Sequence, residues 1–283
     1  MKFVFLAKKI FDFFIFSSLF IALCAVLMVY QTCILFSLPF SFSLAGFVFS
    51  GSVCSYNFHW YLTTHSATGS ERLQWAVKNK TLHFILYLAG LIGSGFFFFK
   101  LREHWYWIAI GAFVTFLYSA PKLPQRMFSL LRKIAVGKTL YLAFVWMYVT
   151  TVLPFVMSGA PWRIEFTWFV LGRFFLIYAI CIPFDYRDRE DDKSDGIRSM
   201  ITLFDEKGID KLFALSMLFF GIFTGLLLLY GFSFLQVALL LVPGIVMAAL
   251  YNYSKRHFSD YFYYFVLDGL MMLSALLMLI LRI

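Results

Sequence analysis

The sequence predicts an all-α membrane protein, because apolar residues dominate it and recur in long uninterrupted runs. Of 283 residues, 62% are hydrophobic and only 14% are charged, and the mean hydropathy is +0.82. Soluble domains carry roughly 25% charged residues. Soluble enzymes, disordered chains and disulfide-stapled secreted scaffolds are therefore excluded. We expect one integral-membrane domain over residues 1–283.

The apolar runs have the length of membrane-crossing helices, which need about 20 mainly apolar residues. No strand-like alternation competes with them, so the sequence predicts a bundle of nine transmembrane helices. The predicted spans are 11–36, 40–62, 81–100, 104–120, 139–158, 166–184, 211–231, 234–252 and 261–281.

The first predicted span follows Lys2, Lys8 and Lys9, and no small-residue cleavage site closes it, so we interpret it as a helix and not as a signal peptide. Most of the 24 Lys and Arg residues fall in the connections on the same side as this terminus. The positive-inside rule then predicts a cytoplasmic N-terminus. The net charge of +9 has the same explanation, and no nucleic-acid partner is expected.

The connection after the sixth predicted helix carries the densest charge, with six acidic residues between positions 185 and 195. If the helix continues through it, Asp185, Asp188 and Asp192 share one face, within roughly 60°. Carboxylates gathered in this way suit Mg²⁺, which bridges them to a substrate's phosphates. The alternative is a solvated helix end in which Arg187, Arg189 and Lys193 neutralise the acids.

The acidic stretch resembles the second aspartate motif of the UbiA superfamily of intramembrane prenyltransferases. Asp185, Asp188 and Asp192 match its D-x-x-D-x-x-x-D pattern, and residues 196–199 match the Gly-Ile-Arg-Ser that follows. Residues 118–122, Tyr-Ser-Ala-Pro-Lys, are similar to a second stretch of the family. The family places the aspartate motif at the cytoplasmic end of helix 6 of nine.

The resemblance implies an enzyme that transfers a prenyl group from a polyprenyl diphosphate to a lipid or aromatic acceptor with Mg²⁺. It implies that Asp185, Asp188 and Asp192 are the metal ligands, at a cytoplasmic site of the plasma (inner) membrane. The residues expected to bind the diphosphate are Asn57, Lys122, Arg126, Arg189 and Arg198. Positive-inside bias also accounts for Lys122 and Arg126.

The family's first aspartate motif, N-D-x-x-D-x-x-x-D, is degenerate in this chain. Asn57 is present, but its three acid positions hold Phe58, Tyr61 and His65. Imidazole favours Zn²⁺ over Mg²⁺, and His59 and His65 point in different directions on a helix. The alternative function is therefore a non-catalytic protein of the same fold that binds or transports an isoprenoid lipid.

Two charged residues, Arg173 and Asp268, lie deep within predicted spans, where an uncompensated charge costs at least about 2.5–3.5 kcal/mol. We expect the two side chains to form an ion pair between the sixth and ninth helices.

Overall fold

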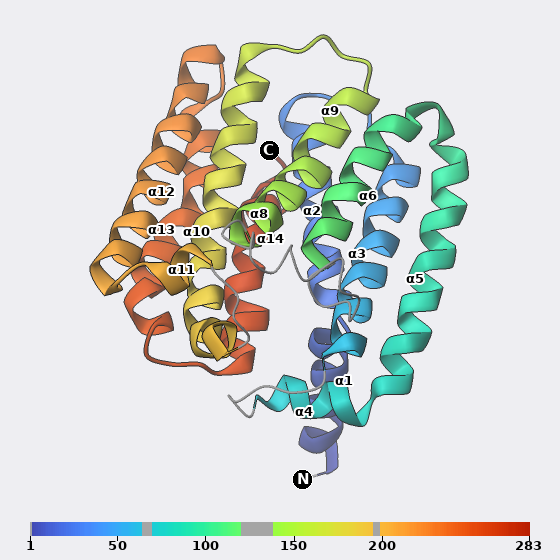
Figure 1. Cartoon of the computed structure of the whole chain (residues 1–283). Helices are drawn as coiled ribbons and strands as arrows, with labels where there is room; N and C mark the ends of the chain where they lie inside the picture. The colour runs from blue at the N-terminus through green and yellow to red at the C-terminus, as the bar shows by residue number, and fades with distance from the viewer. Residues whose placement is uncertain (1, 64–69, 120–137, 195–198) are drawn as a thin grey trace.

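The computed structural model describes residues 2–63, 70–119, 138–194 and 199–283, and every regular element within these ranges is helical (Figure 1). This confirms the all-α class. The elements are α1 (Lys2–Phe16), α2 (Leu19–Leu35), α3 (Phe42–Leu62), α4 (Glu71–Lys78), α5 (Lys80–Lys100), η1 (Arg102–His104), α6 (Trp105–Ser119), α8 (Lys138–Met147), η5 (Tyr148–Val152), α9 (Leu153–Met157), α10 (Ile164–Ser194), α11 (Met200–Leu203), α12 (Glu206–Leu226), η6 (Leu227–Tyr230), α13 (Phe234–Ser254), η7 (Phe262–Leu267) and α14 (Asp268–Leu281).

Six helical stretches of the described chain are long and apolar enough to cross a membrane, and a seventh is added if the bent pair α1–α2 is one span. A multi-pass membrane protein is thus supported. Helical structure lies over all nine predicted segments, but α3 and α6 are not among these six or seven stretches. The count of nine spans and the orientation of the N-terminus stay predictions.

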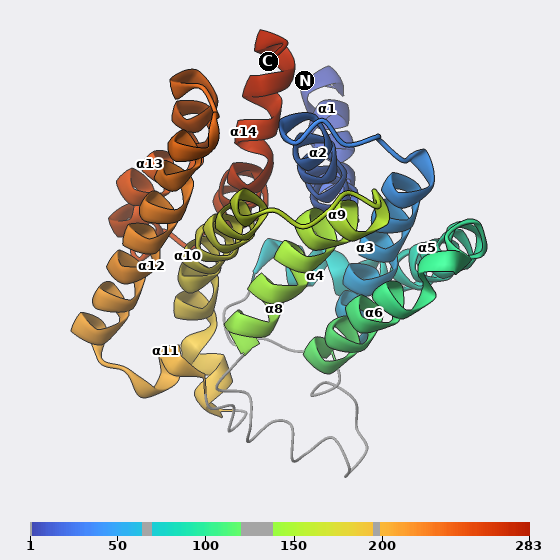
Figure 2. The same ribbon diagram turned by 90° about the horizontal axis from the view of Figure 1, so that it is seen from above.

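The long helices pack in a ring, whose order can be followed in Figure 2, and buried apolar side chains fill the space between them. Contacts run from α3 through α2, α14, α13, α12, α10, α8 and α6 and back to α3, with α5 packed outside α3. Met28, Ile177, Met247 and Leu267 belong to the large buried cluster inside this ring. The two termini lie at opposite ends of the bundle in Figure 1.

The first predicted span, residues 11–36, is wrong as a single straight helix. It is divided into α1 and α2, which meet at an angle of 59°. Ser18 lies in the left-handed region, with φ 68°. The Ser17 carbonyl accepts a hydrogen bond from Asn57 Nδ2 of α3 at 2.9 Å. Tertiary hydrogen bonding therefore accompanies the break, which the apolar pattern alone could not show.

The sixth predicted span, residues 166–184, ends too early. The helix α10 continues through Pro183 to Ser194, so the acidic motif is helical as far as Ser194. Side-chain ion pairs stabilise this polar extension, including Lys193 with Glu190 at 2.9 Å and Arg189 with Glu206 of α12 at 3.0 Å. Hydropathy shows where the apolar part of a helix ends, whereas α10 continues beyond its apolar part as a polar helix.

A short helix, α4, lies where the sequence indicated only a polar connection. Ser70 caps it by accepting a hydrogen bond from the Leu73 backbone N–H at 3.1 Å. The helix buries Arg72, Leu73 and Ala76 against the bundle. It therefore carries one charged side chain into the interior, at the end of the bundle where the N-terminus lies (Figure 1).

At Gly90 the backbones of α3 and α5 approach each other closely. A Cβ at Gly90 would lie 2.6 Å from the Cys54 nitrogen and 2.8 Å from the Ser50 carbonyl oxygen. Both are backbone atoms of α3 and cannot move without moving the helix. Gly95, one turn further along α5, has no atom within 4 Å of such a Cβ.

We predict that Gly90→Ala lowers the free energy of unfolding by about 1–3 kcal/mol, because the added methyl forces α3 and α5 apart. The matched control Gly95→Ala should be neutral or stabilising by up to about 1 kcal/mol, since alanine favours the helix. Unfolding in detergent micelles measures both changes. Equal stability of the two variants would contradict the close approach.

Candidate functional site

Two buried arginines meet at the end of the bundle that also holds α4 and the C-terminal part of α10 (Figure 1). Arg72 comes from α4 and Arg187 from α10, and their neighbours Asp260 and Tyr264 come from the start of the last helical segment. We call Arg72, Arg187, Asp188, Asp260 and Tyr264 the arginine cluster. Arg72 is 3% exposed and Asp260 is 6% exposed, so these two members are removed from solvent, whereas the Asp188 side chain is partly exposed.

The guanidinium of Arg72 lies between two aromatic rings. Its Cζ is 4.3 Å from the ring centre of Trp60 and 3.9 Å from that of Tyr264. One nitrogen donates to the Ser18 hydroxyl at 3.2 Å, and the Arg72 backbone N–H donates to Asp260 at 2.9 Å. The stacking joins the end of α3 to the last helical segment through a cation.

Arg187 ties α10 to the same ring. It donates to the Tyr264 hydroxyl at 2.9 Å and to Asp188 at 2.7 Å, and it lies 3.8 Å from Asp260. Three buried atoms of the cluster have no hydrogen-bond partner among the described residues: Arg72 Nε, Arg187 Nη1 and Asp260 Oδ1. Buried polar atoms are normally paired, so these three mark a place for a polar group or water.

Burial lowers the pKa of the Arg72 guanidinium, because the charged form loses its hydration. The nearby carboxylates of Asp268 and Asp260 act in the opposite direction on this pKa and favour the charged form. The acidic neighbours therefore compensate the cation within the protein. Asp268, which the sequence predicted to pair with Arg173, is one of these neighbours of Arg72.

The three acids of the motif lie along α10, with Asp185 and Asp192 buried and the Asp188 side chain 37% exposed. Asp185 accepts a hydrogen bond from the Thr139 hydroxyl of α8, and Asp188 faces Arg187. Within the described ranges, no three His, Cys, Asp or Glu side chains are grouped closely enough to hold a metal ion. The carboxylates keep protein partners of their own.

The residues predicted to bind diphosphate are only partly placed. Asn57 is fully buried, and its amide donates to the Ser17 and Val53 carbonyls while its oxygen lies 2.7 Å from His83 Nδ1. Arg189 pairs with Glu206 and Glu190 on the outer side of α10. Three of the predicted residues lie outside the described ones: Lys122, Arg126 and Arg198.

The positions of the degenerate first motif face α5. Phe58 packs against Tyr87 with ring centres 5.1 Å apart, and Tyr61 packs against Phe84 at 5.5 Å. His65 lies outside the described residues. At these two positions the chain has aromatic side chains that pack between α3 and α5, and no acids.

The predicted ion pair between Arg173 and Asp268 is wrong. Arg173 donates to the Gln31 side chain at 2.6 Å and to the Met28 carbonyl at 3.1 Å, both of α2. The Asp268 carboxylate instead favours the charged form of Arg72. Arg173 is hydrogen-bonded to uncharged oxygen atoms of α2 and not to the Asp268 carboxylate, which was expected as its partner only because both residues lie deep within predicted spans.

Four members of the arginine cluster were not singled out as site residues in the sequence: Arg72, Arg187, Asp260 and Tyr264. Arg72 and Arg187 were counted there as ordinary loop charges. A usable signal exists for Arg72, because Ser70 and Glu71 form a helix start and Leu73 and Ala76 then share its inward side. The pairing of α4 with Asp260, far along the chain, leaves no local signal.

Comparison of the chain with known proteins identifies no relative. No family model, no curated protein and no solved structure matches the chain. The resemblance to the UbiA superfamily therefore rests on the motifs alone.

We predict that the burial of an ion pair of α10, more than the distance between its charged atoms, sets its coupling free energy. In a double-mutant cycle, Arg187→Gln and Asp260→Asn should couple by about 1–3 kcal/mol, since both groups are withdrawn from solvent. Arg189→Gln and Glu206→Gln, a closer but exposed pair, should couple by less than about 1 kcal/mol.

Unfolding at low and high salt checks this order. Salt should reduce the coupling of the exposed pair and leave that of the buried pair nearly unchanged. A larger coupling for Arg189 with Glu206 would show that the cluster is hydrated.

Proposed function

We propose that the chain is a UbiA-like prenyltransferase, which transfers a prenyl group from a polyprenyl diphosphate to a lipid or aromatic acceptor with Mg²⁺. The observation that carries this proposal is the continuation of α10 through the acidic motif. Asp185, Asp188 and Asp192 thereby stand at positions i, i+3 and i+7 of one helix. A loop would not fix them in this register.

The surroundings of the motif support a diphosphate as the ligand. Trp60 of α3 and Phe184 of α10 both pack against Tyr264, with ring centres 6.0 Å and 5.9 Å away. The ends of the two helices that carry the family's motifs therefore lie near one another. Arg187, beside Asp188, supplies a cation for phosphate oxygens, and its Nη1 makes no hydrogen bond although it lies 3.8 Å from Asp260.

Hard carboxylate oxygens are the donors that suit Mg²⁺, and a diphosphate would add the oxygens that the separated acids lack. When bound, the metal would stabilise the charge that develops on the departing diphosphate. Asp185, Asp188 and Asp192 would hold it. Arg187 and Arg189 would neutralise and orient the phosphates, and the aromatic side chains would exclude water from an allylic cation and stabilise it.

We propose that this site faces the cytoplasm in the plasma (inner) membrane, and the charge distribution supports the cytoplasmic side. The N-terminal lysines, α4 and the acidic end of α10 lie at one end of the bundle (Figure 1). The positive-inside rule assigns that end to the cytoplasm.

A second candidate function is binding or transport of an isoprenoid lipid without turnover. The specific observation that favours it is the aromatic packing of Phe58 and Tyr61 against α5, where the family has acids. One of the two carboxylate groups is then missing, and a lipid diphosphate would be held without being ionised.

Purified protein with labelled farnesyl or geranylgeranyl diphosphate, with and without Mg²⁺, tests the proposal. We expect Mg²⁺-dependent binding of the diphosphate and release of pyrophosphate. Asp188→Asn should weaken both by at least ~10-fold, because a charge-assisted contact is lost. The control Glu190→Gln, a 70% exposed side chain of the same helix, should leave both unchanged.

The outcomes separate the two functions. Mg²⁺-dependent binding without pyrophosphate release would favour the binding protein. Binding that is indifferent to Mg²⁺ and to Asp188 would overturn both, and the acidic motif would then be a solvated helix end.

A further inference from the structure

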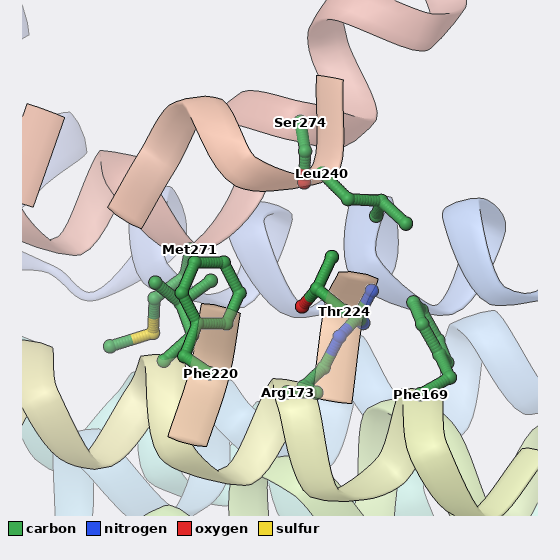
Figure 3. Close-up of a pocket in the computed structure, with 8 residues that line it drawn as sticks. Phe169, Arg173, Phe220, Thr224, Leu240, Met271 and Ser274 are labelled. Carbon is green, nitrogen blue, oxygen red and sulfur yellow. The ribbon is translucent and has the colours of Figure 1, made fainter. Parts of the chain in front are cut away.

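A small cavity lies among α10, α12, α13 and α14, away from the arginine cluster. Its wall is mainly apolar, with Phe169, Leu176, Phe220, Leu240 and Met271, and three polar residues also line it: Arg173, Thr224 and Ser274. Figure 3 draws Arg173 and Phe169 of α10 and Thr224 of α12 among the residues that line this cavity. Its volume is about 20 Å³, room for one water-sized ligand and too little for a phosphate or a prenyl chain.

The positive charge of Arg173 has no counterion in the described part of the chain. The side chain is 6% exposed, and its three hydrogen-bond acceptors are uncharged: Gln31 Oε1, the Met28 carbonyl and the Thr150 hydroxyl at 3.5 Å. No described carboxylate forms an ion pair with it. An isolated cation inside an apolar helix bundle is strongly unfavourable unless an anion or polar group compensates it.

Thr224 provides the second, independent observation. Its side chain is 4% exposed, and its hydroxyl has no hydrogen-bond partner among the described residues. The comparable buried hydroxyls of Thr150 and Ser216 donate to the carbonyl one turn earlier, at 2.6 Å and 2.7 Å. Thr224 makes no such bond, and its side chain lines the cavity that Arg173 also lines (Figure 3).

We propose that this cavity binds one monatomic anion of the halide class, such as chloride, between the Arg173 guanidinium and the Thr224 hydroxyl. The site offers a positive charge and hydrogen-bond donors, which an anion uses fully. A water molecule would also satisfy the Thr224 hydroxyl, but it would leave the charge of Arg173 without a counterion. The apolar wall suits a weakly hydrated ion, and the small volume excludes carboxylates and oxyanions.

Thermal unfolding of the purified protein in chloride, bromide or gluconate at equal ionic strength tests this site. Gluconate is too large to enter. We expect the wild-type Tm to rise by about 3 °C in either halide relative to gluconate, because the ligand binds only the folded state. Thr224→Val, which keeps the shape and removes the donor, should abolish most of this rise.

The matched control is Ser216→Ala, on the same helix, whose hydroxyl is satisfied within α12. This variant should keep the full halide-dependent rise. Crystals grown in bromide should show anomalous scattering beside Arg173. An equal Tm in halide and gluconate, an equal response of both variants, or bromide found only elsewhere would overturn the proposal in favour of water. None of these outcomes depends on prenyltransferase activity.

Discussion

Every charged side chain that enters this bundle must find its partners inside the protein, because hydrocarbon around the helices offers no hydrogen bonds. The chain meets this constraint in two different ways. At the polar end, Arg187 pairs with the carboxylates Asp188 and Asp260, and both arginines contact Tyr264. Further inside, Arg173 is held by neutral oxygens of α2.

The same constraint explains why the first helical segment is broken. Asn57 is buried at the end of α3 and needs acceptors for its amide. A Ser17 carbonyl released by the bend between α1 and α2 supplies one, and Val53 supplies the other. The Asn57 oxygen is in turn satisfied by His83 of α5. One polar side chain thereby joins three helices that would otherwise meet only through apolar contacts.

The apolar runs were enough to predict the fold class and the approximate position of each long helix, since burial in lipid needs a continuous apolar surface. They could not locate the break at Ser18 or the end of α10 at Ser194, because both depend on contacts with distant segments. The spacing of Asp185, Asp188 and Asp192 predicted a shared face only if the helix continued, and α10 does continue through all three. The spacing could not show that Asp185 and Asp188 have partners on Thr139 and Arg187.

The positions of Arg173 and Asp268 deep within predicted spans indicated that both residues are buried, and both are. These positions could not predict the partners of the two residues, because partner choice depends on the relative heights of helices that are far apart in the chain. A long arginine side chain can also reach neutral acceptors that a carboxylate cannot use. Charge neutrality is therefore a weaker guide to pairing than hydrogen-bond geometry.

The aromatic side chains at the end of α3 and the stacking of Arg72 have a common physical consequence. Three carboxylates at the end of α3 would repel those of α10, and the two helix ends would then need bound cations between them. In this chain Phe58 and Tyr61 face α5 instead, and the guanidinium of Arg72 stacks between Trp60 and Tyr264. Arg187 binds the same Tyr264 from α10. A cation that belongs to the protein thus joins the two helix ends, and their proximity does not require a metal ion.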